Sequence, residues 1–173
     1  MKKSILIVFA ALALTACDNK NIAKDAYKGL DKQEKELAEL DSITKQARST
    51  FDDFKLALEM RDSTMSNFFV KEEFLVTEGE RTRQEHLWIR DIYQDGNVLK
   101  GIIDNQPVAT SDVKVNDTIV IDDAKVSDWM FYKREPKDTV ARIIGGYSVK
   151  FMRNKLSETE KIEFDKQYQA SFD

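Results

Sequence analysis

Five strand-like segments follow one another between Phe68 and Tyr132, and their short connections constrain the fold more than any other feature of the sequence. Each segment has apolar side chains near every second position and is bounded by turn-forming residues. The expected strands are residues 68–77, 84–93, 98–104, 115–122 and 126–132. Parallel pairing needs crossover connections of about a dozen residues or more, usually through a helix. The strands should therefore pair mainly antiparallel, in a twisted sheet.

A sixth strand is expected over residues 139–151, after an exposed loop around Pro136. Gly145 and Gly146 interrupt this segment, and glycines inside a strand indicate a bulge or a close approach of another backbone. The pair is followed neither by a lysine nor by an expected helix start, so it does not resemble a phosphate-cradling loop. The sequence accordingly predicts no cofactor.

Before the first strand, apolar residues recur at intervals of three and four, which is typical of one face of an amphipathic helix. They are Leu37, Leu40, Thr44, Ala47, Phe51, Phe54 and Leu58. One long helix is therefore expected over residues 32–61. Its stripe could form the seam of a coiled-coil dimer or could pack on the chain's own sheet. Phe51 and Phe54 suit a flat sheet surface better than regular knobs-into-holes packing, which favours the second alternative.

A short helix is expected at the carboxyl end, within residues 157–173. Ser157 followed by Glu160 can form a capping box, and Phe164 and Tyr168 supply an apolar face. The fold class is therefore α+β: a twisted, mainly antiparallel sheet of about five or six strands, covered by a long N-terminal helix. A single domain of this kind should occupy residues 32–156.

The amino terminus has the layout of a secretory leader. Lys2 and Lys3 precede an apolar run over residues 5–14, which is too short to span a bilayer. The run ends in Leu14-Thr15-Ala16-Cys17, which resembles the lipobox of bacterial lipoproteins. The resemblance implies that residues 1–16 are a signal peptide. An ordinary secretory signal followed by a chance cysteine is the alternative.

The lipobox also implies that Cys17 carries lipid and anchors the protein to a membrane of the bacterial cell envelope, facing the periplasm or the exterior. Residues 17–31 are polar with little periodicity and are expected to form a tether. Cys17 is the only cysteine, so a disulfide within the chain is excluded. Loss of the two leader lysines lowers the net charge from −4 to about −6, which argues against nucleic acid as a partner.

Six short motifs occur in order along the chain: Phe69-Val70-Lys71, Glu85-His86-Leu87-Trp88, Gly101 with Asn105 and Pro107, Asp117-Thr118-Ile119-Val120, Ser127-Asp128-Trp129-Met130, and Gly145-Gly146-Tyr147. This series resembles the bacterial family called domain of unknown function 2314, and the resemblance covers about residues 47–152. The chain departs from the family pattern at residues 131–144, which lengthen the connection before the two glycines, and at Lys150, where an arginine is common. Because the family's function is unassigned, the resemblance implies a fold rather than an activity.

Asp128 and His86 are the candidate catalytic residues. Asp128 interrupts an apolar strand and is expected on the same face as Val126 and Met130, where an unpaired carboxylate would be costly. We therefore expect it either to pair with His86 or to cap the backbone amides of a bend. His86, the sole histidine, could act as a general base near neutral pH or could be a hydrogen-bonded structural residue. No serine or threonine is marked out as a nucleophile.

Six further residues are candidates for a binding surface: Trp88, Asn105, Trp129, Gly145, Gly146 and Tyr147. Aromatic residues are frequent binding anchors, but packing in the core is their commoner use. A metal site is not expected, because one histidine, scattered carboxylates and a lipidated cysteine do not supply clustered ligands.

The sequence thus favours a lipid-anchored envelope protein without enzymatic activity, whose domain binds another protein or a small ligand. The alternative is an envelope hydrolase with His86 as general base and Asp128 as the group that orients it. The two hypotheses differ in geometry, since a hydrolase needs His86 to open into a pocket beside a second polar group.

Overall fold

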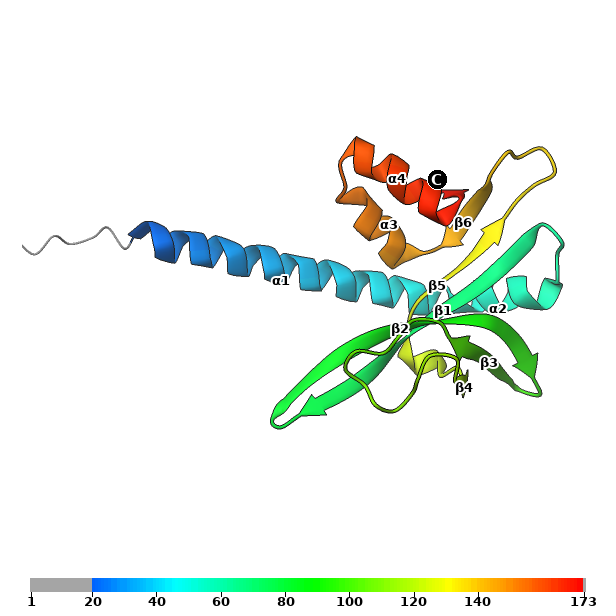
Figure 1. The fold of residues 1–173 in the computed structure, drawn as a ribbon, viewed down its shortest axis with the longest axis horizontal. Coiled ribbons are helices and arrows are strands. Elements are labelled where there is room, and N and C mark those ends of the chain that lie inside the picture. Colours follow the sequence, from blue (N-terminus) through cyan, green and yellow to red (C-terminus); the bar gives the residue numbers. More distant parts are fainter. Residues whose placement is uncertain (1–19, 173) are drawn as a thin grey trace, which may run out of the picture. The chain divides into compact units, whose positions relative to one another are not determined.

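The computed structural model describes residues 20–172, and the chain divides into two units, residues 1–37 and 38–173. The described helices are α1 (Lys20–Ser49), α2 (Phe51–Met60), α3 (Tyr147–Asn154), α4 (Glu158–Tyr168) and the short 3₁₀-helix η1 (Asp123–Lys125). The described strands are β1 (Met65–Glu78), β2 (Arg81–Asp95), β3 (Val98–Ile103), β4 (Thr118–Val120), β5 (Val126–Lys133), β6 (Ala141–Gly145) and β7 (Ala170–Ser171), all in the second unit (Figure 1). The expected signal peptide and the lipidation site at Cys17 lie outside the described residues.

The strands form one sheet in the order β4-β3-β2-β1-β5-β6-β7. Every neighbouring pair is antiparallel except β6 and β7, which run parallel. The α+β class and the mainly antiparallel sheet are confirmed. The expected count of five or six strands is wrong, because the described chain returns after α4 to add the two-residue strand β7 at the sheet edge.

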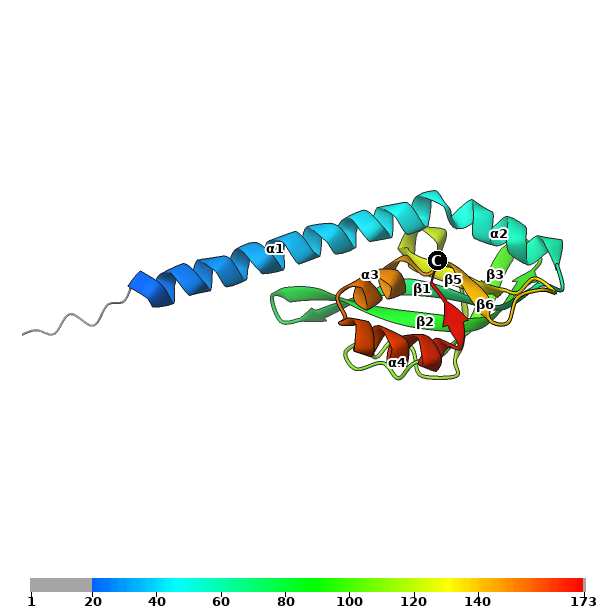
Figure 2. The ribbon, with the colours of Figure 1, turned by 90° about the horizontal axis from the view of Figure 1, so that it is seen from above.

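Both faces of the sheet are covered by helices (Figure 2). On one face, Phe51 and Phe54 of α2 pack with Trp129 and Phe131 of β5 in the larger core cluster. On the other face, Met130 of β5 packs in a second cluster with residues of β6, α3, α4 and the carboxyl end. The α2 segment therefore packs on its own sheet, as the aromatic stripe indicated.

The expected single helix over residues 32–61 is instead two helices separated at Thr50. The Thr50 hydroxyl donates to the carbonyl oxygen of Gln46 at 2.9 Å, and a threonine that bonds backward in this way loosens the helical ladder. The Nε1 of Trp129 donates to the carbonyl oxygen of Ala47 at 2.9 Å, which occupies an acceptor at the break. α1 also begins earlier than expected, so the proposed tether is helical from Lys20. The expected end near Arg61 is confirmed, with Arg61 as the C-cap of α2.

The expected strand over residues 139–151 is wrong beyond Gly145. β6 ends there, Gly146 is the N-cap of α3, and both glycines have positive φ angles of 74° and 63°. A strand cannot continue through two residues in that conformation, so the chain turns into a helix. The expected strand over residues 115–122 is also shorter, covering only β4, while Asn116 has the positive φ of 70° that its turn position suggested.

The remaining local expectations are confirmed. β1, β2, β3 and β5 occupy the segments in which strands were expected, and the capping box of Ser157 and Glu160 starts α4. Among the described residues, no helix is both long enough and apolar enough to cross a membrane.

Candidate functional site

Asp128 is completely buried and caps the first turn of α3. Its Oδ1 accepts from the backbone amides of Trp129 at 2.8 Å and Tyr147 at 3.0 Å. Its Oδ2 accepts from the Ser148 amide at 2.8 Å and from the Ser148 hydroxyl at 2.6 Å. Helix-terminal amides have no partner inside the helix and carry partial positive charge, so a carboxylate stabilises them. Of the two roles expected for Asp128, the structure has the cap of backbone amides.

A bulge in β5 directs Asp128 toward α3. Lys71 of β1 is opposite Asp128, but the next residue, Glu72, is opposite Val126, so Ser127 is an extra residue without a partner position. The expected grouping of Val126 with Asp128 and Met130 on one face is therefore wrong. Val126 packs in the core cluster beneath α2, and Met130 belongs to the opposite cluster.

Lys71 contacts the same cap through Ser148. Its Nζ donates to the Ser148 hydroxyl at 3.2 Å and lies 5.0 Å from the ring centroid of Trp88. Burial lowers the pKa of Lys71, and the negative charge of Asp128 opposes that shift. The single hydroxyl proton of Ser148 is donated to Asp128, so Lys71 faces an oxygen that accepts from it. The Ser148 hydroxyl therefore bridges the half-buried Lys71 and the buried Asp128, which is unlike a lysine that removes a proton from a nucleophile.

His86 is hydrogen-bonded to Ser127, with 2.8 Å between His86 Nδ1 and Ser127 Oγ. The Ser127 hydroxyl donates to the carbonyl oxygen of Lys71 at 3.2 Å, so its lone pair is available to His86. The neutral imidazole is therefore protonated on Nδ1 and leaves Nε2 as an acceptor. His86 is an exposed residue, but partial desolvation of its ring, followed by the charge of Lys71, lowers the pKa of His86. The expected pairing with Asp128 is not formed, since the carboxylate is occupied by α3.

Two of the six expected binding residues, Trp129 and Tyr147, hold the helices to the sheet. Trp129 is only 3% exposed, and its ring meets that of Tyr147 edge-on, with 5.7 Å between centroids. The Tyr147 hydroxyl lies 2.9 Å from the hydroxyl of Thr50, at the break between α1 and α2. Both side chains therefore pack between the helices and the sheet, with Tyr147 partly exposed.

Gly145 and Gly146 are buried at the same junction. A Cβ atom on Gly145 would overlap the carbonyl oxygen and ring of Trp129, and one on Gly146 would approach Ile143 to 2.9 Å. The expected close backbone approach is thus confirmed, and both glycines are buried.

Trp88 and Asn105 are joined to each other on the opposite side of β2 from the α2 core. The Asn105 side-chain oxygen accepts from the Trp88 backbone amide at 2.7 Å, and it fixes the start of the loop after β3. The Trp88 ring is half-buried beneath Lys71 and packs with the cluster around Met130. Trp88, like Tyr147, combines a large aromatic ring with partial exposure.

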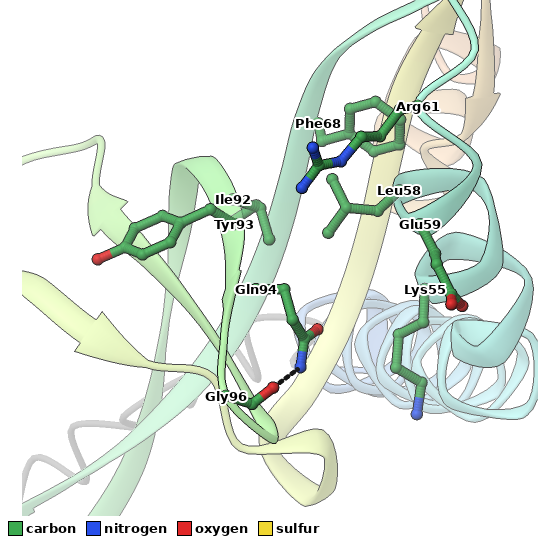
Figure 3. Close-up of a pocket in the computed structure, with 9 residues that line it drawn as sticks. All are labelled: Lys55, Leu58, Glu59, Arg61, Phe68, Ile92, Tyr93, Gln94 and Gly96. Atoms are coloured by element: carbon green, nitrogen blue, oxygen red, sulfur yellow. Dashed lines mark hydrogen bonds between the residues drawn. The ribbon is translucent and has the colours of Figure 1, made fainter.

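A cavity of about 680 Å³, which no sequence motif predicted, lies between α2 and the neighbouring strands (Figure 3). Leu58 from the last turn of α2, Phe68 from β1 and Ile92 from β2 form its apolar wall. Ile92 reaches this face because β2 has a register shift between Arg90 and Tyr93. The volume is in the range of small-molecule sites in proteins, which are mostly apolar with a few polar groups.

Charged and amide side chains line the same cavity: Lys55, Glu59, Arg61 and Gln94. Lys55 forms ion pairs of 2.6 Å with Asp52 and 2.9 Å with Asp123, and these hydrogen bonds raise its pKa. The Gln94 amide donates to the carbonyl oxygen of Gly96 at 2.8 Å. The cavity can therefore hold an apolar group next to charged and hydrogen-bonding groups. Within residues 20–172, no cluster of three or more histidine, cysteine or acidic side chains could hold a metal ion.

Two curated relatives resemble the chain. A protein of Neisseria meningitidis named as an ankyrin repeat protein is 32% identical over 90 residues, which are 51% of this chain and 32% of that protein. The chain thus matches about a third of that relative's length. The uncharacterized protein YegJ of Escherichia coli is 28% identical over 148 residues, covering 85% of this chain and 86% of that protein. No solved structure matches the chain at a significant level. The chain belongs, as its six motifs indicated, to the bacterial family DUF2314 of uncharacterized conserved proteins, whose model matches residues 38–172.

Proposed function

We propose that this protein is a lipid-anchored binding module of the bacterial envelope, without enzymatic activity, and that its ligand enters the cavity beside α2. The cavity of about 680 Å³, with its apolar wall and charged rim, is the observation that carries the binding role. The lipoprotein-like segment that ends at Cys17 supports the anchor and the envelope location.

The hydrolase hypothesis has less support. It needs an imidazole oriented by a carboxylate and open to a pocket with a second reactive group. Asp128 uses both of its oxygens on α3 and Trp129, and His86 is oriented by Ser127. The cavity beside α2 is lined by neither His86 nor Asp128.

Binding of another protein through the aromatic and glycine residues also has less support. Trp129, Gly145 and Gly146 are buried under the helices, so they offer little surface to a partner. The cavity is the better candidate for a contact, and a small molecule fits its dimensions.

The binding role is tested by filling the cavity. Gln94→Trp places a large ring at its rim, and Gln84→Trp puts the same ring at an exposed site elsewhere on β2 as a matched control. Each full-length variant is purified from native envelopes, and the molecules that copurify are measured by mass spectrometry. The proposal expects a small molecule with wild type and Gln84→Trp that is lost in Gln94→Trp. Equal recovery of the same molecules from all three would contradict it.

The anchor is tested separately. Cys17→Ser removes the proposed lipid acceptor, so the protein should move from the membrane fraction to the soluble fraction of the envelope. Metabolic labelling with a fatty-acid analogue should mark wild type and not the variant. Unchanged fractionation and labelling would refute lipidation without affecting the cavity test.

A further inference from the structure

The cavity is lined by two cations, Lys55 and Arg61, which differ in how far the described residues neutralise them. Among the described residues, Arg61 has no acidic partner, although Asp62 follows it directly. The Asp62 carboxylate instead accepts from the backbone amide of Thr64 at 2.8 Å, which also lowers the pKa of Asp62. The guanidinium therefore remains available to a ligand.

The second cation of the cavity differs in this respect. The Lys55 ammonium is held between Asp52 and Asp123, at 2.6 and 2.9 Å, so its charge is already compensated. The carboxylate of Glu59 lies on the Lys55 side of the cavity, whereas the Arg61 guanidinium lies on the other side (Figure 3). The net positive potential should thus be greatest beside Arg61.

The apolar wall lies next to this free charge. Figure 3 shows the Arg61 side chain beside Leu58 and Phe68, with Ile92 across from it. Leu58 and Phe68 are half-buried, and Ile92 is 8% exposed, so an apolar ligand that lies here would remove further apolar surface from water. An anionic head and an apolar body could therefore be bound at the same time.

We infer that the cavity selects an amphipathic carboxylate, with its head paired to Arg61 and its apolar body against Leu58, Phe68 and Ile92. A guanidinium presents two parallel N–H groups that match the two oxygens of a carboxylate. This inference rests on the proposed function, because it names the chemical class of the ligand for the same cavity. The occupant is a small molecule.

The test uses three probes that separate head from tail: decanoate carries both, acetate carries the head alone, and decan-1-ol carries the tail alone. Binding to the full chain is followed by calorimetry and by amide chemical shifts of Arg61, Phe68, Ile92 and Gln94. Decanoate should bind more tightly than either partial probe and should shift these amides. Binding of decan-1-ol as tightly as decanoate, or shifts confined to other residues, would overturn the inference.

The decisive variant is Arg61→Asn. Arg61 has a φ of 50°, and asparagine accepts this left-handed conformation better than most residues, so the variant should fold normally. Loss of a charge-assisted pair should weaken decanoate binding by about 10- to 100-fold. Arg61→Lys keeps the positive charge but loses the planar fork, so its affinity for decanoate should lie between those of wild type and Arg61→Asn. Lys137→Gln removes a positive charge from an exposed loop and should leave decanoate binding unchanged.

The outcomes distinguish the inference from the function on which it rests. If Gln94→Trp abolishes recovery of the native ligand while Arg61→Asn retains both that ligand and decanoate, the cavity binds its ligand without an ion pair to Arg61, and the inference fails alone. If Gln94→Trp has no effect on recovery, the proposed function fails as well. If a peptide ending in an apolar residue displaced the native ligand and decanoate did not, the occupant would be a polypeptide. That result would overturn the inference.

Discussion

Ser148 donates two hydrogen bonds to the same oxygen of Asp128, one from its backbone amide at 2.8 Å and one from its hydroxyl at 2.6 Å. This pair joins the first turn of α3 to the middle of β5, across a sequence separation of 20 residues. Burial raises the pKa of the completely buried Asp128, while these donors, two other amides and the nearby charge of Lys71 stabilise its negative charge. The stability of the junction should depend on all of them together.

The first prediction concerns this cap. Asp128→Asn replaces one acceptor oxygen with an NH₂ group, which cannot accept from Ser148 and leaves the Lys71 charge unpaired. The variant should lose about 2–4 kcal/mol of unfolding free energy, measured by urea denaturation. Asp112→Asn, at an exposed carboxylate, should change the free energy by less than about 0.5 kcal/mol. Equal effects of the two substitutions would contradict the capping role.

The second prediction compares two glycines with similar backbone conformation. Gly145 and Gly96 have φ angles of 74° and 60°, so alanine should be strained by about 1–2 kcal/mol at either position. A Cβ on Gly145 would also overlap Trp129, whereas nothing lies within 4 Å of one on Gly96. Gly145→Ala should therefore cost about 1–3 kcal/mol more than Gly96→Ala in thermal or urea unfolding. If both variants lost the same stability, backbone strain alone would explain Gly145.

The third prediction is a pH dependence of stability. Glu72 is 2% exposed, its Oε1 accepts from the Asp122 amide at 2.6 Å, and burial raises its pKa from 4.5 to about 7. Between these two values the unfolded chain binds fewer protons than the folded one, so the contribution of Glu72 to stability falls as the pH rises. Glu72→Gln retains an acceptor and removes the charge.

The stability gained by Glu72→Gln should be near zero below about pH 4.5 and should reach about 1–3 kcal/mol above about pH 7. Urea unfolding from pH 4 to 8 measures the difference from wild type. Glu80→Gln, in the exposed β1–β2 turn, controls for the loss of a surface charge. A difference that does not change with pH would show that Glu72 ionises normally.

The fourth prediction concerns the protonation of His86. The hydrogen bond to Ser127 places the proton of the neutral ring on Nδ1, and partial desolvation of the ring with the charge of Lys71 lowers the pKa of His86 below 6.5. Nitrogen NMR should therefore show Nδ1 protonated near neutral pH and a titration midpoint below 6.5. Because the folded state resists protonation, His86 should reduce stability as the pH falls through this window, and His86→Gln should relieve that loss. Ser127→Ala should relax the preference for Nδ1, and an unchanged tautomer in that variant would contradict the assignment.

Much of the fold was predictable from short stretches of sequence. The turn at Asp95-Gly96-Asn97, the capping box of Ser157 and Glu160, and the alternation along β2 are all encoded by residues a few positions apart. Such signals act within one element, so they do not depend on what the element packs against. The antiparallel pairing followed from connection lengths alone.

The site was less predictable because strand bulges change which side chains share a face. Asn67 and Asp91 have positive φ angles of 51° and 53° near register shifts in β1 and β2, and the Ser127 bulge lies in β5. Strict alternation places Ile92 opposite Ile89, yet both pack in the core beneath α2. The cavity was not predicted because this change of face brings Ile92 into its wall.

By itself, the sequence determined the α+β class, most strand positions, the start of α4 and membership of the family. Only the tertiary structure decided that α3 follows Gly146, that the long helix divides at Thr50, and that Asp128 caps α3 instead of pairing with His86. Local turns and caps are fixed by neighbours along the chain. A buried carboxylate takes whichever donors the packed strands and helices bring to it, and those donors come from segments far apart in sequence.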